Sequence, residues 1–208
     1  MSYNSAMAEI IVVHGTPGAG KSTHSERLAN YSINERPVFH ISAGNRLRDI
    51  RIGVVESAYS SVINSPDAPS LLDHRVVNGV IFEFVSQCPE NSIVLVDGYP
   101  RFSDATGVFL ETIKEGNHTL LGCINLNISL ETSTERLSGR GMRSGERIKG
   151  GSSAEFAEKR YADHLKYTNE AVQTLGEVAR VINVDAESDL NTVWEAYNEA
   201  FKTLTTKE

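Results

Sequence analysis

Cysteine is scarce in this chain, with two among 208 residues. Cys88 and Cys123 are far apart and lie in or beside apolar stretches, and the sequence contains no C-x-x-C pair. Because structural zinc sites need closely spaced Cys or His ligands, a zinc site is unsupported. We expect Cys123, which lies within an apolar run, to be an inert core side chain.

Long apolar runs and an excess of positive charge are also absent from the sequence. No run approaches the roughly 18 apolar residues that a membrane span needs. Residues 1–8 lack the basic start and apolar segment of a signal peptide. With 27 acidic and 20 basic residues, the formal net charge is −7, whereas a general binder of nucleic acids or membrane surfaces is expected to be basic. We therefore expect a cytoplasmic protein without a nucleic-acid or membrane partner.

Five short runs rich in Val and Ile predict β-strands. They lie at residues 9–14, 38–42, 92–97, 121–127 and 179–184. Helical patterns separate them, which favours an α/β fold with a parallel sheet covered on both faces. Because 40% of the residues are apolar, one sizeable core can form, and we predict a single domain over residues 1–208.

The most specific motif is Gly-Thr-Pro-Gly-Ala-Gly-Lys-Ser-Thr, which fits the phosphate-binding pattern G-x-x-x-x-G-K-[ST]. It follows the first strand-like run and opens a helical pattern, as the pattern requires. Its glycines let backbone N–H groups surround phosphates. Lys21 can reach the outer phosphates, and the Ser22 hydroxyl can ligate Mg²⁺. The predicted ATP-binding residues here are Gly15, Pro17, Gly18, Ala19, Gly20, Lys21, Ser22 and Thr23.

Asp97 ends the third apolar run, where a carboxylate gains nothing by packing. Ligands of parallel sheets bind beyond the carboxyl ends of the strands. We therefore interpret Asp97 as a carboxylate that faces Mg²⁺ or its water shell, as in other phosphate-loop enzymes. A turn cap before Gly98 is the alternative.

A dense group of basic residues interleaved with glycines occupies residues 135–149. Its members are Arg136, Arg140, Arg143, Arg147 and Lys149. The first two are four residues apart, so they would share one face of a helix. We predict a mobile lid that brings guanidinium groups to phosphates. The alternative is an exposed loop in which some of these arginines pair with neighbouring acids.

The segment between the second and third strands is longer than a simple crossover needs and carries Arg46, Arg48 and Arg51 near its start. We predict an inserted helical subdomain, with helices at residues 50–63 and 71–85. A further helix should start at a capping box over residues 152–155 and run to about residue 175. The last helix carries one apolar stripe, which we expect to pack in the core. The stripe comprises Leu190, Val193, Trp194, Tyr197 and Phe201.

With these motifs in hand, the chain resembles the adenylate kinase family of nucleoside monophosphate kinases. Residues 15–23 resemble its phosphate loop and residues 41–48 its first monophosphate-binding segment. Asp-Gly-Tyr-Pro-Arg at 97–101 is similar to the family's Asp-Gly-Phe-Pro-Arg, and residues 135–147 to a short lid. The resemblance implies a P-loop NTPase fold: a five-stranded parallel sheet of order 2-3-1-4-5, a monophosphate-binding insertion at 44–85 and a short lid at 139–152.

The resemblance also implies roles for individual residues. Lys21 and the arginines Arg136, Arg140, Arg147 and Arg160 would attend the donor phosphates and the group in transfer, and Arg136 would belong to the ATP site. The acceptor monophosphate would be bound by Ala43, Gly44, Arg48, Gly98, Arg101 and Ala105. Mg²⁺ would enter with ATP, near Ser22 and Asp97, and the protein would be a monomer.

Several positions depart from the family pattern. Asn45 stands where the family has an aspartate, and residues 148–151 lack two adjacent acids that help to position the lid. Ala105 replaces an amide side chain that usually reads the acceptor base, whereas Ala43 resembles the UMP/CMP branch. The base of the acceptor is therefore open.

The predicted reaction is phosphoryl transfer from Mg·ATP to a nucleoside monophosphate, which gives ADP and a nucleoside diphosphate. Such a reaction needs alignment and charge neutralisation more than covalent chemistry. Two alternatives stay open: a kinase of a hydroxyl acceptor such as a nucleoside or small metabolite, and a nucleotide-binding module without turnover. Arg48 and Arg101 argue against the first, since two arginines suit a phosphate acceptor.

Overall fold

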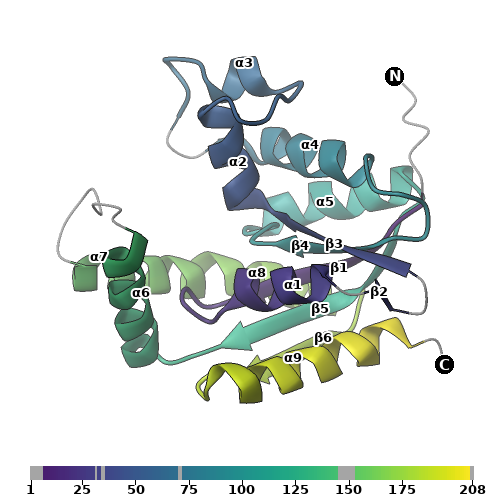
Figure 1. Cartoon of the computed structure of the whole chain (residues 1–208). Coiled ribbons are helices and arrows are strands. Elements are labelled where there is room, and N and C mark those ends of the chain that lie inside the picture. Colours follow the sequence, from purple (N-terminus) through teal and green to yellow (C-terminus); the bar gives the residue numbers. More distant parts are fainter. Residues whose placement is uncertain (1–6, 31, 34–35, 70–71, 145–152, 207–208) are drawn as a thin grey trace.

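The structure, a computed structural model, describes residues 7–30, 32–33, 36–69, 72–144 and 153–206 (Figure 1). For residues 32–33, 139–144 and 153 it describes the backbone alone. The predicted capping box begins at Ser152 and so lies partly outside the described residues. Most of the predicted lid, including Arg147, lies outside them as well.

Five parallel strands form the sheet, and their order confirms the predicted 2-3-1-4-5 arrangement. In sheet order they are β3 (Arg36–Ser42), β4 (Ile93–Asp97), β1 (Glu9–Gly15), β5 (Thr119–Asn127) and β6 (Val181–Asp185). The structure adds a short edge strand, β2 (Ser32–Ile33), which pairs antiparallel with β3. Two residues are too few for an alternating pattern, so the sequence did not predict β2.

Helices cover both faces of the sheet, as predicted, and two buried apolar clusters lie between the layers (Figure 1). On one face pack α4 (His74–Val85), α5 (Ser103–Glu115) and α8 (Asn169–Gly176). On the other pack α1 (Lys21–Ala29) and α9 (Leu190–Thr205). Phe109 of α5 and Tyr197 and Phe201 of α9 are fully buried.

The prediction of one continuous helix over residues 50–63 is wrong. Instead, α2 (Ala43–Arg51) begins directly after β3, and a single turn, α3 (Ser60–Ile63), follows later. The Ser42 hydroxyl caps α2 by accepting from the Asn45 N–H at 3.5 Å. Gly53 then adopts a φ of 72° just past the helix, a conformation that other residues rarely take. The chain therefore starts this helix earlier and stops it sooner than the apolar pattern suggested.

The helix predicted to end near residue 175 is built in three parts. α7 (Ser153–Asp163) leads into a π-helical turn, η1 (His164–Thr168), and then into α8. Before them, α6 (Leu130–Ser144) places residues 139–144, the start of the predicted lid, in a helix. In α9 the predicted stripe is buried at Val193, Tyr197 and Phe201 and half-buried at Trp194. Leu190 is 57% exposed, so the prediction is wrong for Leu190.

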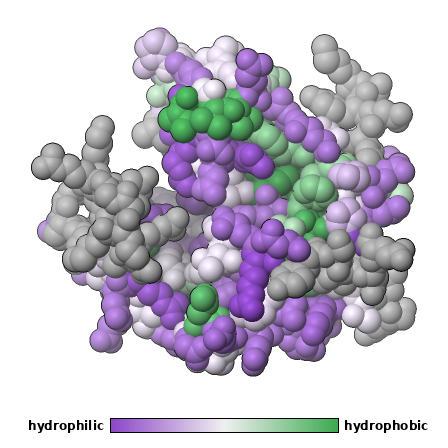
Figure 2. Space-filling model, in the orientation of Figure 1, coloured by the Kyte–Doolittle hydropathy of each residue, from purple (hydrophilic) through white to green (hydrophobic). Residues whose placement is uncertain are grey.

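The outer surface is mostly hydrophilic on the face seen in Figure 2. Exposed apolar side chains include Ile52, Val54 and Val62 on the α2–α3 segment, which rises above the sheet in Figure 1. Cys123 is fully buried, as predicted, and burial raises the pKa of its thiol to about 12, so it stays protonated and unreactive. None of the described helices has the length and apolar character needed to cross a membrane.

Candidate functional site

The predicted phosphate loop connects β1 to α1 at the carboxyl end of the central strand. Gly15 has a φ of 145°, and a Cβ there would lie 2.2 Å from the Leu126 carbonyl oxygen of β5. The loop is tied to β5 by the Thr16 N–H, which donates to the same carbonyl at 3.0 Å. The Thr16 hydroxyl accepts from the Ile128 N–H, also at 3.0 Å. Glycine is therefore required at position 15 because the backbones of β1 and β5 almost touch there.

Lys21 and Ser22 stand in the first turn of α1, beneath the loop. The Lys21 ammonium donates to the carbonyl oxygens of Gly15 and Thr16, at 2.7 and 3.0 Å. The Ser22 hydroxyl donates to a carboxylate oxygen of Asp97 at 2.6 Å. The fold thus brings together Ser22 and Asp97, the two residues that the sequence predicted as metal ligands.

Asp97 is 3% exposed, yet its surroundings favour the ionised form. Burial alone would raise the pKa of the carboxyl group, but a hydrogen bond from His40, the charge of Lys21 and the hydrogen bond from Ser22 lower it below its usual value. The Nε2 atom of His40 lies 3.4 Å from the Asp97 carboxylate. No motif in the sequence indicates a role for His40, although its place two residues before the end of β3 was an available signal.

The oxygen atoms of Ser22 and Asp97 are of the kind that Mg²⁺ prefers. A hydroxyl and an ionised carboxylate 2.6 Å apart, next to a phosphate loop, fit the protein's share of a Mg²⁺ site in which phosphates and water supply the remaining ligands.

Two arginines predicted for the acceptor phosphate lie on neighbouring segments, Arg48 on α2 and Arg101 just after β4. Both are exposed, and neither forms an ion pair within 4 Å with a carboxylate of the described residues. The Arg101 Nε–H donates to the Gly98 carbonyl at 2.9 Å, and Arg48 donates to the Asn45 side chain. Both cations thus retain charge for an anionic ligand.

The alanines predicted at the acceptor site are both buried, Ala43 at 5% exposure and Ala105 at 0%. The Tyr99 hydroxyl lies 3.5 Å from the Ala105 carbonyl oxygen and donates to the His74 carbonyl at 3.1 Å. Neither alanine offers a polar atom beyond its backbone, so neither side chain can hydrogen-bond a base.

The predicted arginines of the donor side are only partly described. Arg136 turns towards the loop between β6 and α9, where its guanidinium donates to the carbonyl oxygens of Ala186, Glu187 and Ser188. Arg160 lies on α7, with its guanidinium 5.6 Å from the centre of the Phe156 ring. Arg140 lies in α6 with only its backbone described.

Two imidazoles that the sequence did not predict adjoin the phosphate site: His14, which is buried, and His164, which is half-buried. Burial, followed by the charges of His164, Lys21 and Arg101, lowers the pKa of His14 to about 3. Burial and the charges of the same lysine and arginine lower the pKa of His164 to about 4. Both imidazoles are therefore neutral near pH 7. For His14 the sequence signal was its place directly before Gly15.

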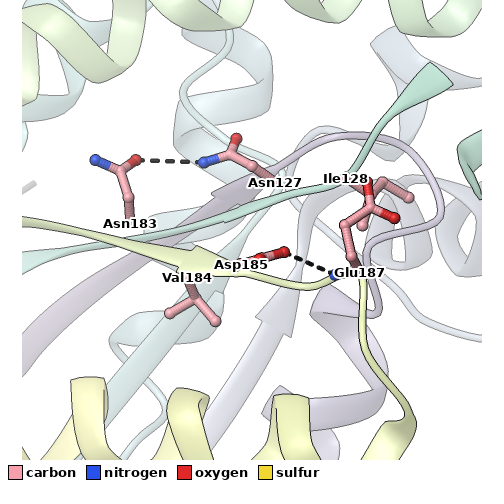
Figure 3. A pocket seen from close by; sticks show the side chains of 6 residues that line it. All are labelled: Asn127, Ile128, Asn183, Val184, Asp185 and Glu187. Atoms are coloured by element: carbon pink, nitrogen blue, oxygen red, sulfur yellow. Dashed lines mark hydrogen bonds between the residues drawn. The ribbon is translucent and has the colours of Figure 1, made fainter.

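A cavity of about 420 Å³ opens at the carboxyl ends of β5 and β6 (Figure 3). Its lining comprises Asn127, Ile128, Asn183, Val184, Asp185 and Glu187. It adjoins the phosphate loop, because the Ile128 N–H is the donor to the Thr16 hydroxyl. A smaller cavity of about 200 Å³ lies between α1 and α2 and is lined in part by His40 and Asn45.

The AAA domain family matches residues 14–151, which begin just before the phosphate loop and make up more than half of the chain. The chain belongs to the AAA domain family. The phosphate loop, the sheet order and the Ser22–Asp97 pair described above are all contained in the matched part of this AAA domain protein.

Curated relatives of this AAA domain protein carry the name adenylate kinase, which confirms the resemblance predicted from the motifs. The relative from Lactiplantibacillus plantarum is 29% identical over 135 residues, or 62% of this chain and 57% of its own length. The relative from Latilactobacillus sakei is 31% identical over 135 residues, with the same coverage of each chain. The relative from Streptococcus pneumoniae is 31% identical over 136 residues, 62% of this chain and 59% of its own length. The matches thus span less than two thirds of these relatives.

Proposed function

We propose that this AAA domain protein is a nucleoside monophosphate kinase, which transfers the γ-phosphoryl group of Mg·ATP to a nucleoside monophosphate. The observation that carries the proposal is the arrangement of charge around the phosphate loop. Lys21 and the Ser22–Asp97 pair stand on the donor side. Arg48 and Arg101 stand exposed on neighbouring segments and form no ion pair within the described residues.

The donor's phosphates would bind to the backbone N–H groups of the loop. Lys21 would then exchange its two carbonyl partners for phosphate oxygens and neutralise charge that develops on the group in transfer. The Ser22 hydroxyl would hold Mg²⁺ together with the Asp97 carboxylate or water bound to it. When bound, the ion neutralises charge on the outer phosphates. Arg140 and Arg147 of the predicted lid, with Arg160 of α7, would supply the remaining positive charges around the donor phosphates.

The acceptor would be an anion, since two arginines face its side of the sheet. A phosphate oxygen of the monophosphate would attack the γ-phosphorus, the bond to the bridging oxygen of ADP would break, and no proton transfer is required. The methyl groups of Ala43 and Ala105 cannot read a base through hydrogen bonds, so we propose weak selectivity for the acceptor base.

We also propose that the chain acts as one kinase domain, with residues 44–85 as the acceptor-binding insertion and residues 139–152 as the lid. The insertion contains α2, α3 and α4, of which α2 carries Arg48. Closure of the lid would exclude water from the phosphoryl group and so suppress hydrolysis of ATP.

The test is an ADP-release assay with Mg·ATP against AMP, CMP, UMP, GMP and dTMP and a panel of nucleosides. We expect turnover with at least one monophosphate, and Lys21→Ala should lower it by about a hundredfold or more because one electrostatic stabiliser is lost. Lys202→Ala is the matched control, since this lysine is exposed on α9 and, within the described part of the chain, its one ion pair is with Glu199 at 3.9 Å. Turnover with nucleosides alone would indicate a hydroxyl acceptor, and ATP binding without turnover a non-catalytic module.

A further inference from the structure

The segment formed by α7 and η1 turns one face of three rings towards the sheet. Tyr161, His164 and Tyr167 are half-buried, whereas the residues between them are exposed. A spacing of three residues places the rings on one side of a helical segment. The last two belong to the π-helical turn η1, and such turns are frequent at functional sites. We call these three residues the inner face of α7–η1.

The two tyrosines fix where the inner face lies. The Tyr161 hydroxyl donates to the Ile128 carbonyl, just after β5, at 2.9 Å. The Tyr167 ring packs on the ring of Phe102, which follows Arg101, with ring centres 5.1 Å apart. Since β5, β1 and β4 are neighbours in the sheet, the inner face runs from the end of β5, past the end of β1, to the segment after β4.

His164 lies between the two tyrosines, beside the end of β1. The charges of Lys21 and Arg101 both act on its imidazole, and its own charge acts on the imidazole of His14. The Nε2 atom of His14 is buried without a hydrogen-bond partner among the described residues, which costs free energy unless a ligand or water supplies one. Two cations and two imidazoles from four segments of the chain therefore surround one place at this edge of the sheet.

The other charged groups near His164 do not balance these two cations. The Asp97 carboxylate acts on His14 from the end of β4. The charged side chains on the turns that flank His164 are exposed to solvent, where water screens them. They are Arg160, Asp163, Lys166 and Glu170. An anion that enters between Lys21 and Arg101 would therefore dominate the field at His164.

We propose that His164 is a further phosphate ligand on the acceptor side, which takes up a proton from solvent when a monophosphate binds. The proposal rests on the acceptor binding proposed above. Tyr167 holds the segment beside Arg101, one of the two arginines of that acceptor site. A monophosphate there brings negative charge to an imidazole that burial and two cations keep neutral. Because a nearby anion favours the charged form of histidine, binding raises the pKa of the ring and makes it a charged donor.

A packing role for His164 makes a different prediction. A side chain that only fills space contributes equally at every pH. A ligand that gains a proton contributes most in mild acid, where protons are available, and almost nothing in base. His164→Gln separates the two roles, since glutamine keeps a neutral hydrogen-bond donor and removes the titration.

The experiment measures the dissociation constants of AMP, CMP, UMP, GMP and dTMP by calorimetry at pH 5.5 and pH 8, for the wild type and His164→Gln. If binding raises the pKa of His164 from about 4 to its ordinary value, linkage strengthens binding about tenfold at pH 5.5 and less than about twofold at pH 8. For each monophosphate that binds, the variant should therefore bind about tenfold more weakly at pH 5.5 and about equally at pH 8. Titration of the ligand's own phosphate is common to both proteins and cancels.

The matched control is His118→Gln. This histidine is also half-buried, but it lies just before β5, at the opposite end of the strand, where its Nδ1 atom accepts from the Ala8 N–H at 3.2 Å. The control should bind each monophosphate as the wild type does at both pH values. If His164→Gln fails to fold, NMR of the wild-type ring decides instead: the pKa of His164 should rise from about 4 towards 6.5 when the monophosphate saturates the protein.

The outcomes distinguish the inference from the proposed function. A loss in His164→Gln that is equal at both pH values, no loss at either, or a ring pKa that the monophosphate leaves unchanged would overturn the inference alone. A rise in the ring pKa with ATP but not with a monophosphate would assign His164 to the donor side and overturn it as well. A wild-type protein that binds ATP but no monophosphate would overturn the proposed function, and the inference with it.

Discussion

His14 should make the protein sensitive to acid, because its imidazole is buried in the neutral form. It is 2% exposed, and its Nε2 atom has no hydrogen-bond partner among the described residues. Burial is the main cause that lowers its pKa from 6.5 to about 3. In the unfolded chain the pKa returns to its ordinary value, so between pH 6.5 and 3 the unfolded state binds a proton that the folded state refuses. The free energy of unfolding must therefore fall as the pH falls through this window.

The size of the loss follows from the two pKa values. At pH 4.5 about 99% of unfolded chains carry the proton at His14, which by linkage lowers the free energy of unfolding by about 3 kcal/mol. At pH 7 the same linkage effect is negligible, so acidification from pH 7 to pH 4.5 should lower the free energy of unfolding by about 3 kcal/mol through His14 alone. The result depends mainly on the unfolded value, because any folded pKa well below 4.5 gives nearly the same difference.

The assay is urea unfolding of the wild type, His14→Leu and His14→Asn at pH 7 and pH 4.5. The wild type also loses stability through other groups, such as His24, whose pKa burial lowers to about 4. These groups are common to all three proteins and cancel in the comparison. On acidification both variants should lose about 3 kcal/mol less stability than the wild type. Because asparagine is polar and leucine is not, agreement between the two variants assigns the effect to titration of His14. Equal losses in all three proteins would refute the reasoning.

Two further predictions concern the phosphate site. Asp97→Asn keeps an acceptor for the Ser22 hydroxyl but removes the charge, so the Mg²⁺ concentration for half-maximal turnover should rise by about 10–100-fold; Asp104→Asn, at an exposed acid of α5, should leave it unchanged. Gly15→Ala would place a methyl group 2.2 Å from a backbone oxygen of β5, so urea unfolding should show a loss of about 3 kcal/mol or more. Gly107→Ala is the control for backbone freedom: its Cβ meets nothing within 4 Å in α5, and it should stabilise the protein by up to about 1 kcal/mol. Equal destabilisation of both alanine variants would contradict the steric argument.

Much of the sheet was predictable because strand formation has a local signature. The runs of Val and Ile in β1 and β4 are buried along nearly their whole length. Short continuous apolar runs of this kind are typical of strands in a parallel sheet that is covered on both faces. The order of the strands did not follow from these runs; it came from the resemblance to adenylate kinases. The start of α2 was missed because a single hydroxyl, that of Ser42, outweighed the apolar pattern that pointed further along the chain.

By itself the sequence determined the phosphate loop and the residue types around it. The glycines, Lys21 and Ser22 act within one turn of chain, where backbone geometry is a short-range property. Only the tertiary structure decided what Arg136 and His14 do. The carbonyl partners of Arg136 lie 50–52 residues away, and the charges that lower the pKa of His14 include Arg101 and His164. A guanidinium or an imidazole has no fixed role in sequence, because its charge and its hydrogen bonds depend on which distant segments the fold brings within a few ångströms of it.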